Sequence, residues 1–247
     1  IQDSLVGSEM CIRDRVNIAQ PFKSSGMMLT CRKDMGVNST ADLKGKTLGV
    51  WFYGNEYPFL SWMSRLGLKT DGSANGVTVL RQGWGVEPLT EGQAACVSTM
   101  SYNEYWVVRD AGYSPEQLTV FKYQSEGAAT LEDGLYVHEK NLSDAAFKDK
   151  MVRFVRASMK GWKYAEANPK EAAMIILDND DAGVQTEKHQ VRMMGEIAKL
   201  TAGSNGSLDP ADYERTVKVL MSGDSDPVIT KKPSGAWTNE ITNAALN

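Results

Sequence analysis

An Asn-Glu-Tyr tripeptide occurs twice in this chain, at residues 55–57 and again at residues 103–105. Each copy follows a short apolar run, opens a segment with helical spacing and has another tyrosine just before it, Tyr53 for the first copy and Tyr102 for the second. Carboxylates and amides bind the polar edges of a small molecule, and aromatic rings stack on its flat faces. The two copies together are therefore suited to holding a planar ring with polar substituents.

These two loops need a fold that brings them together. Trp51 ends the apolar run before the first copy, and Trp84 follows another run, which ends at Leu80. In an open parallel sheet, the carboxyl ends of the strands and the N-termini of the next helices face one crevice, and ligands bind there. A plainer interpretation stays open, because Asn followed by Glu is also ordinary chemistry for the start of a helix.

Motifs of the common enzyme classes are missing from the sequence. It contains no HExxH, GxSxG or Walker A pattern, and the glycines on either side of Trp84 lack the third glycine and the helix of a dinucleotide loop. The two histidines, His138 and His189, have no evident nucleophile or metal partner. We therefore expect no catalytic residue, no metal and no cofactor.

The three cysteines of the chain also argue against a zinc site, because none lies at CxxC or Cys/His spacing. The spacing neither establishes nor excludes a disulfide. We expect Cys31 and Cys96 to be buried free thiols, since free cysteine usually behaves as a small apolar residue.

Composition limits the partners of the protein. The chain has 247 residues, 42% of them hydrophobic and 23% charged, with a formal net charge of -4. Its basic residues are scattered among acids, which disfavours binding to nucleic acid. No apolar run approaches the roughly 18 residues of a membrane span. These values are typical of a globular protein.

Short apolar runs alternate with helical segments in the first part of the chain. Strands are expected at residues 27–31, 47–51, 77–80, 95–99 and 118–121, with helices at residues 59–66, 86–91 and 103–111. Asn55 is the expected N-cap of the first helix and Gly67 its end. This alternation predicts a mostly parallel sheet with helices on both faces.

After a further strand at residues 134–137, the pattern is helical only. Helices begin near Phe147, Pro169, Thr186, Pro210 and Thr238, with Asp209 as an N-cap. One apolar stripe on the first of them consists of Phe147, Met151, Phe154, Val155, Ser158, Met159 and Trp162. These helices need a sheet to cover, and the remaining strands are too few, so we expect part of a sheet to be missing.

The first fifteen residues differ from the rest of the chain. Residues 1–15 show neither helical nor strand period, and their string resembles the translation of a sequencing-adapter remnant. We expect this segment to lie outside the fold, with any natural N-terminal segment lost.

Several ordered motifs resemble one known protein group. They are Asp-Leu-Lys-Gly-Lys-Thr-Leu-Gly-Val at residues 42–50, Gly-Asn-Glu at residues 54–56, Leu-Glu-Asp-Gly-Leu at residues 131–135, and the segment 153–165. They are similar to solute-binding proteins of the thiamine-pyrimidine-precursor and nitrate/sulfonate/taurine group, from about Pro21 to Trp237. The same fold family includes thiamine pyrimidine synthases, which make the pyrimidine from a histidine and pyridoxal phosphate with iron.

This resemblance implies a type II periplasmic-binding-protein fold, in which two α/β lobes joined by a hinge close on the ligand, with the first part of lobe one missing here. Residues 16–32 would end lobe one and enter the hinge, residues 33–128 would form lobe two, residues 129–136 would cross back, and residues 137–247 would be the helical remainder of lobe one. The hinge crossings are expected at residues 28–32 and 130–136.

The resemblance also implies a function, the substrate-binding component of an ABC importer. Because the two tripeptide loops contain glutamates and no lysine or arginine, we expect a ring with amino or N–H donors, such as a thiamine pyrimidine precursor, rather than an anion. The expected ligand-binding residues are Trp51, Tyr53, Gly54, Asn55, Glu56, Trp84, Tyr102, Asn103, Glu104 and Glu132.

Three alternatives remain at this point. One is the synthase, although residues 127–132 read Gly-Ala-Ala-Thr-Leu-Glu where its cysteine-rich motif should fall, and the segment with its cofactor lysine is absent. The others are a protein that binds sulfonate, taurine or nitrate, and one that binds a flavin. A binding protein of this kind would work in the periplasm or another extracytoplasmic space, with a permease as its partner and its only connection to the membrane.

Overall fold

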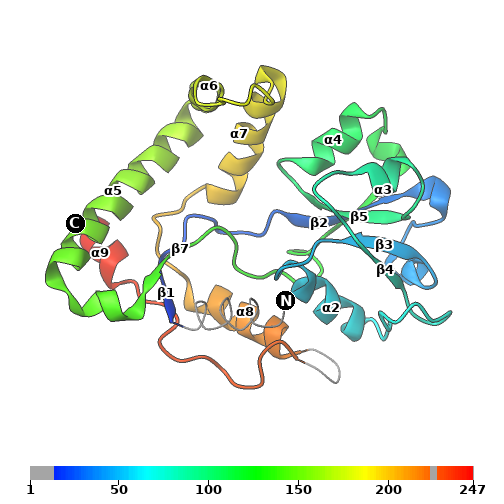
Figure 1. Ribbon diagram of the computed structural model, residues 1–247, viewed down its shortest axis with the longest axis horizontal. Helices are drawn as coiled ribbons and strands as arrows, with labels where there is room; N and C mark the ends of the chain where they lie inside the picture. The colour runs from blue at the N-terminus through cyan, green and yellow to red at the C-terminus, as the bar shows by residue number, and fades with distance from the viewer. Residues whose placement is uncertain (1–13, 223–226, 247) are drawn as a thin grey trace.

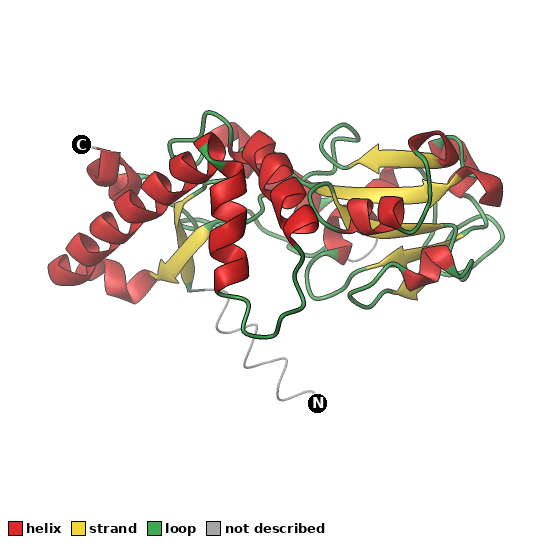
Figure 2. Cartoon of the chain, turned by 90° about the horizontal axis from the view of Figure 1, so that it is seen from above, coloured by secondary structure: helices red, strands yellow, loops and turns green. Residues whose placement is uncertain are grey.

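The structure is a computed structural model that describes residues 14–222 and 227–246. Two halves lie side by side along its long axis, one built on a five-stranded sheet and the other mostly helical (Figure 1). Figure 2 shows the same division from above, with the strands of the larger sheet at one end and the long helices at the other. The predicted α/β class is confirmed.

The larger sheet has the strand order β4-β3-β5-β2-β6. Its strands are β2 (Met27–Arg32), β3 (Thr47–Val50), β4 (Thr78–Arg81), β5 (Cys96–Met100) and β6 (Leu118–Lys122). β3 runs parallel to β4 and β5, whereas β2 is antiparallel to both β5 and β6. The antiparallel direction of β2 has a local cause. Only the short 3₁₀ turns η1 (Lys33–Met35) and η2 (Thr40–Leu43) separate β2 from β3. A parallel strand would need a crossover connection, usually a helix, and this segment has none.

Helices cover both faces of this sheet, as predicted. On one face, α2 (Glu56–Arg65) buries Phe59, Trp62 and Met63 in the main core cluster. On the other face, α3 (Glu87–Thr90) and α4 (Glu104–Asp110) contribute Leu89 and Val108 to a second cluster. β6 follows the 3₁₀ turn η3 (Pro115–Gln117).

The helical half is built around a two-stranded antiparallel sheet of β1 (Arg15–Ala19) and β7 (Leu135–His138). After the 3₁₀ turn η4 (Glu139–Ser143) come α5 (Ala145–Ala167), α6 (Pro169–Asp178), α7 (Glu187–Thr201), α8 (Pro210–Met221) and α9 (Glu240–Leu246). α5 and α9 pack on the small sheet, and α6 packs on α7. Asp209 caps α8 as predicted, accepting a hydrogen bond from the backbone N–H of Ala211 at 2.8 Å.

The prediction of the apolar stripe on α5 is wrong in part. Val155 and Met159 are buried in the cluster beneath the helix, but the side chain of Phe154 is 52% exposed. Phe154 and Val155 are adjacent, and successive residues on a helix point about 100° apart, so both cannot face the same cluster.

The start of the fold also differs from expectation. Residues 1–13 lie outside the described residues, but Arg15 already begins β1 and pairs with His138 in the register of the small sheet. The carboxylate of Asp14 lies 2.8 Å from the Nδ1 atom of His138. Asp14 and Arg15 therefore take part in the fold, whereas the prediction placed residues 1–15 outside it.

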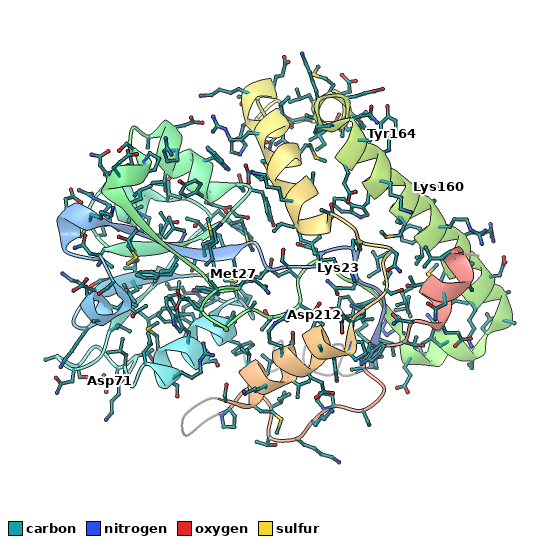
Figure 3. The ribbon with its side chains drawn as sticks, turned by 180° about the vertical axis from the view of Figure 1, so that it is seen from behind. Lys23, Met27, Asp71, Lys160, Tyr164 and Asp212 are labelled. Carbon is teal, nitrogen blue, oxygen red and sulfur yellow. A yellow bond between two sulfur atoms is a disulfide. The ribbon has the colours of Figure 1, made fainter. Side chains whose placement is uncertain are left out.

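Two segments connect the halves, residues 20–26 and residues 123–134. Figure 3, in which Lys23 and Met27 are labelled, shows the first of them leading into the larger sheet. β2 is paired along Met27–Arg32 with both of its neighbours, so this crossing precedes Met27. The hinge crossing expected at residues 28–32 is wrong, because those residues are interior to the sheet.

The expectation of free thiols is also wrong. Cys31 and Cys96 are directly opposite each other on the antiparallel strands β2 and β5, and their sulfur atoms form a disulfide. Both side chains are fully buried, as expected. Sequence spacing could not show the pairing, because it depends on the register of two strands whose cysteines are 65 positions apart in the chain.

Replacing Cys31 and Cys96 together with alanine should lower the free energy of unfolding by about 2 to 4 kcal/mol, because the cross-link restricts the unfolded chain. Denaturant titration with and without reductant measures this loss. Reductant should destabilise the parent and leave the double variant unchanged. A non-reducing peptide map without a Cys31–Cys96 pair would contradict the structure.

Candidate ligand-binding site

A cavity of about 520 Å³ opens where β3, β4 and β5 end. It is lined by Trp51, Phe52, Tyr53, Asn55, Arg81, Gln82, Gly83, Trp84, Met100 and Glu104. These residues end the three strands or follow them in the chain. A second cavity of about 290 Å³ adjoins the first, since Asn55 and Met100 line both. The parallel strands therefore deliver both tripeptide loops to one edge, as the sequence predicts.

The structure brings most of the expected site residues to these cavities. The larger cavity contains Trp51, Tyr53, Asn55, Trp84 and Glu104, and the smaller contains Gly54, Asn55, Tyr102 and Glu132. Glu56 and Asn103 line neither cavity.

Glu56 has a structural role at the start of α2. Its carboxylate accepts a hydrogen bond from the backbone N–H of Gly54 at 2.7 Å. Asn55 occupies the N-cap position, but its side chain makes no capping bond, so the predicted cap is wrong, and the contact of Glu56 is with the loop before the helix instead. For the first copy of the tripeptide, the interpretation as helix-start chemistry accounts for the glutamate.

Glu104, in the second copy, differs from Glu56 because it faces the larger cavity. Its carboxylate accepts hydrogen bonds from the backbone N–H of Met100 at 2.8 Å and from the side-chain amide of Asn103 at 2.7 Å. Burial raises the pKa of Glu104, and these two donors offset part of that effect by favouring the charged form. A cavity-facing carboxylate that is costly to ionise is suited to a ligand that donates a proton or a hydrogen bond.

Glu132 joins the two segments that cross between the halves. It lies on the second crossing, and its carboxylate accepts hydrogen bonds from the first, from the Ser25 hydroxyl and from the backbone N–H of Gly26 at 2.8 Å. Burial raises the pKa of Glu132 as well. The smaller cavity is thus lined by a residue that also connects the two halves.

Aromatic rings form the mouth of the larger cavity. The side chains of Tyr53 and Trp84 are 89% and 96% exposed, which is unusual for rings of this size. The ring N–H of Trp51 donates to the carbonyl of Gly83 at 2.9 Å, which links the loops after β3 and β4. Tyr53 has a φ of 65°, a left-handed conformation that costs free energy for a residue with a Cβ and that recurs at ligand-binding sites.

Sequence reasoning missed Arg81. Its guanidinium lines the larger cavity and lies over the rings of Phe52 and Tyr53, at 5.2 and 4.9 Å from their centroids. Among the described residues, no carboxylate forms an ion pair with Arg81. The expectation of a ligand that is not an anion came from the two tripeptide loops alone, although Arg81 ends the neighbouring strand at the same edge and could have been included on that ground.

Gln82 is another missed residue, and its role is to hold the cavity wall in place. Its buried side chain donates to the carbonyls of Gly85 and Ser98, at 3.1 and 2.9 Å, and accepts from the backbone N–H of Ser98 at 2.8 Å. These bonds join the end of β4 to β5. Because β3 lies between these two strands, the side chain of Gln82 reaches across the end of β3 and links the strands on both sides of it at the edge that lines the cavity.

Glu104→Gln should raise the melting temperature at pH 7, and the gain should vanish at low pH. Because the folded-state pKa of Glu104 is raised, its favourable contribution is full below the unfolded pKa of about 4.3 and is lost as the pH rises through the folded value. Glutamine avoids the cost of a buried charge at every pH. Thermal melts of both proteins between about pH 3.5 and 8 test this, and an equal difference at all pH values would contradict it.

Comparison with known proteins agrees with this architecture. A protein from Bordetella bronchiseptica RB50 superposes with a TM-score of 0.69 at 18% identity, over 97% of this chain and 76% of its own. A putative sulfonate ABC transporter periplasmic protein, SsuA from Methylobacillus flagellatus KT, gives 0.59 at 14% identity, over 94% and 68%. A mutant of the enzyme DSZB in complex with biphenyl-2-sulfinic acid gives 0.60 at 13% identity, over 95% and 79%.

These likenesses confirm the periplasmic-binding-protein-like fold that the sequence motifs implied. A search of curated protein sequences gives no match. The family model described as NMT1/THI5 like matches residues 14–172, more than half of the chain. The chain therefore belongs to the NMT1/THI5-like family.

Proposed function

We propose that this protein is the substrate-binding component of an ABC importer and that it captures a small nitrogen heterocycle, such as an aminopyrimidine, in the larger cavity. The observation that carries the proposal is the pairing of exposed aromatic rings at the mouth with the partly desolvated carboxylate of Glu104 on the wall. Two structural neighbours are named as ligand-binding or sulfonate-binding components of ABC import systems, which supports the binding role.

The aromatic mouth supports a flat ligand. Tyr53 and Trp84 expose large apolar faces to water, which is unfavourable unless a partner covers them. A heteroaromatic ring stacked on either face would bury that surface and gain further stacking energy. The cavity volume of about 520 Å³ falls within the range of small-molecule sites.

Glu104 supports an amino substituent on that ring. A donor N–H placed against this carboxylate would form a charge-assisted hydrogen bond and would replace part of the solvation lost on burial. Because such a donor favours the ionised form, its binding would lower the pKa of Glu104.

Arg81 supports a second candidate, a small organic sulfonate. A guanidinium without a carboxylate partner among the described residues is a natural ligand for a sulfonate oxygen pair. Glu104 lines the same cavity and would repel that group at short range. The heterocycle is therefore favoured. The effect of replacing Arg81 on the affinity for each ligand distinguishes the two candidates in the experiment below.

The residues of the two cavities do not fit the cofactors of the synthase alternative. No lysine is among the described residues that line the two cavities, so none is placed to bind pyridoxal phosphate. Across residues 14–222 and 227–246, no three His, Cys, Asp or Glu side chains are grouped to hold a metal.

We also propose that the protein works in the periplasm or an equivalent extracytoplasmic space and delivers its ligand to a permease. The Cys31–Cys96 disulfide supports this location, because disulfides persist in oxidising compartments. In the described part of the chain, no helix is long and apolar enough to cross a membrane.

Isothermal titration with 4-amino-5-hydroxymethyl-2-methylpyrimidine should give saturable binding, and the compound should be recovered chemically unchanged. Trp84→Ala should weaken this binding by about 1 kcal/mol, or roughly fivefold in Kd, through lost stacking. Tyr136→Ala removes an exposed ring from the other half and should have no effect. No heat with the parent would reject the aminopyrimidine, and a converted product would reject the binding role.

The same titration with ethanesulfonate tests the second candidate. Arg81→Met should change the Kd for the aminopyrimidine by less than roughly threefold, whereas it should weaken a true sulfonate complex by roughly tenfold or more by removing a charged hydrogen-bond donor. Arg153→Met is the matched control, since Arg153 is an exposed arginine on α5 that pairs with Asp149 and lines neither cavity. Tighter binding of the sulfonate than of the aminopyrimidine would favour the second candidate.

A further inference from the structure

Helix α7 reaches across from the helical half and contacts α4 through its side chains. The contact residues are Asn103, Trp106 and Asp110 on the α4 side and Lys188, His189 and Arg192 on α7, and we name this set the α4–α7 clasp. Figure 1 shows α7 at the side of the helical half that is nearest to α4. None of these six residues lines either cavity.

The outer part of the clasp is electrostatic. The guanidinium of Arg192 donates to the Asp110 carboxylate at 2.9 Å and lies 4.6 Å from the centroid of the Trp106 ring. Lys188 donates to the same carboxylate at 3.0 Å. Arg192 and then Lys188 lower the pKa of Asp110, so this pair of contacts stays charged well below neutral pH.

The inner part of the clasp is a chain of hydrogen bonds that leads to the cavity. The side-chain amide of Asn103 donates to Glu104, so its oxygen is the atom that faces His189, and the Nε2 of His189 donates to it at 2.8 Å. Burial, and next the nearby Arg192, lower the pKa of His189, so the imidazole is neutral at pH 7 and carries its proton on Nε2.

We propose that His189 is a positioning residue for the ligand site, acting from the opposite half through Asn103 to orient the carboxylate of Glu104. The proposal rests on the binding function above. Among the described residues, none from α5 to α9 lines either cavity, so α7 can affect the ligand only through residues that lie between them, and Asn103 is one that contacts both His189 and Glu104. Arg192, Lys188 and Asp110 hold α7 at the distance that the chain of hydrogen bonds requires.

The clasp also connects binding to the arrangement of the halves. A ligand that fixes Glu104 fixes Asn103, and an ordered Asn103 presents its oxygen to His189. By reciprocity, separating α7 from α4 would weaken ligand binding by the same factor by which the ligand strengthens the clasp.

The first test measures the pKa of the Glu104 carboxyl in the protein without any ligand. In protein labelled with carbon-13 at the glutamate carboxyls, the Glu104 signal is identified by its loss in Glu104→Gln. His189→Ala should release Asn103 and raise the pKa of Glu104, because a donor to the charged form is lost. His189→Gln, which keeps an N–H near the same position, should restore the parent value. An identical pKa in His189→Ala and the parent overturns the proposal.

The second test uses the aminopyrimidine probe. His189→Ala and Arg192→Met should each weaken its binding by about three- to tenfold, the size of one modest hydrogen bond, while His189→Gln and Lys199→Met stay near the parent. Lys199 is the matched control because it forms an ion pair on the same helix, with Glu196, outside the clasp. If the parent does not bind the probe, the proposed ligand class fails, and the carboxyl titration still decides the role of His189. Equal affinity of all variants in a parent that binds overturns the proposal.

Discussion

The fold depends on one geometric constraint, the shared direction of β3, β4 and β5. Because these strands are parallel, the residues that follow each of them emerge at the same edge of the sheet. The two tripeptide loops, which begin at Asn55 and Asn103, meet there with the Trp84 loop between them in the chain. The side chain of Gln82 joins the end of β4 to β5 near this edge, whereas the Cys31–Cys96 disulfide joins β2 to β5 at the opposite end of the sheet.

The edge concentrates groups that lower stability when no ligand is present. Burial raises the pKa of Glu104 and Glu132, Tyr53 adopts a left-handed conformation, and Trp84 is almost fully exposed. Each of these features costs free energy, and a bound partner can recover the part that comes from the exposed ring and the buried carboxylates. Their grouping around the two adjoining cavities, rather than any single residue, is the reason that we propose ligand binding there.

Glu132 and the α4–α7 clasp show how this edge is connected to the helical half. Glu132 joins the two crossing segments beside the smaller cavity, and the clasp contacts the larger cavity through Asn103 and Glu104. The desulfurization enzyme DSZB shares this fold, so the fold by itself does not decide between binding and catalysis. The distinction between binding and catalysis must therefore come from the residues at the edge where β3, β4 and β5 end.

Much of this organisation could be predicted from the sequence. Apolar runs located the strands, helical spacing located the helices, and the rule for parallel sheets placed Trp51, Trp84 and Glu104 at one edge. The antiparallel direction of β2, the disulfide and the clasp could not be predicted, because each depends on the register or distance of segments far apart in the chain. Identical tripeptides also acquired different roles, since Glu56 turns back to Gly54 while Glu104 faces the cavity. Only the surrounding packing separates them.

Hydrogen–deuterium exchange with and without the aminopyrimidine tests the central claim most directly. If the ligand binds where β3, β4 and β5 end, protection should appear in residues 51–57, 81–85 and 100–105. A weaker effect should appear at residues 186–193, through the clasp. Protection elsewhere, with these segments unchanged at saturating ligand, would contradict the account.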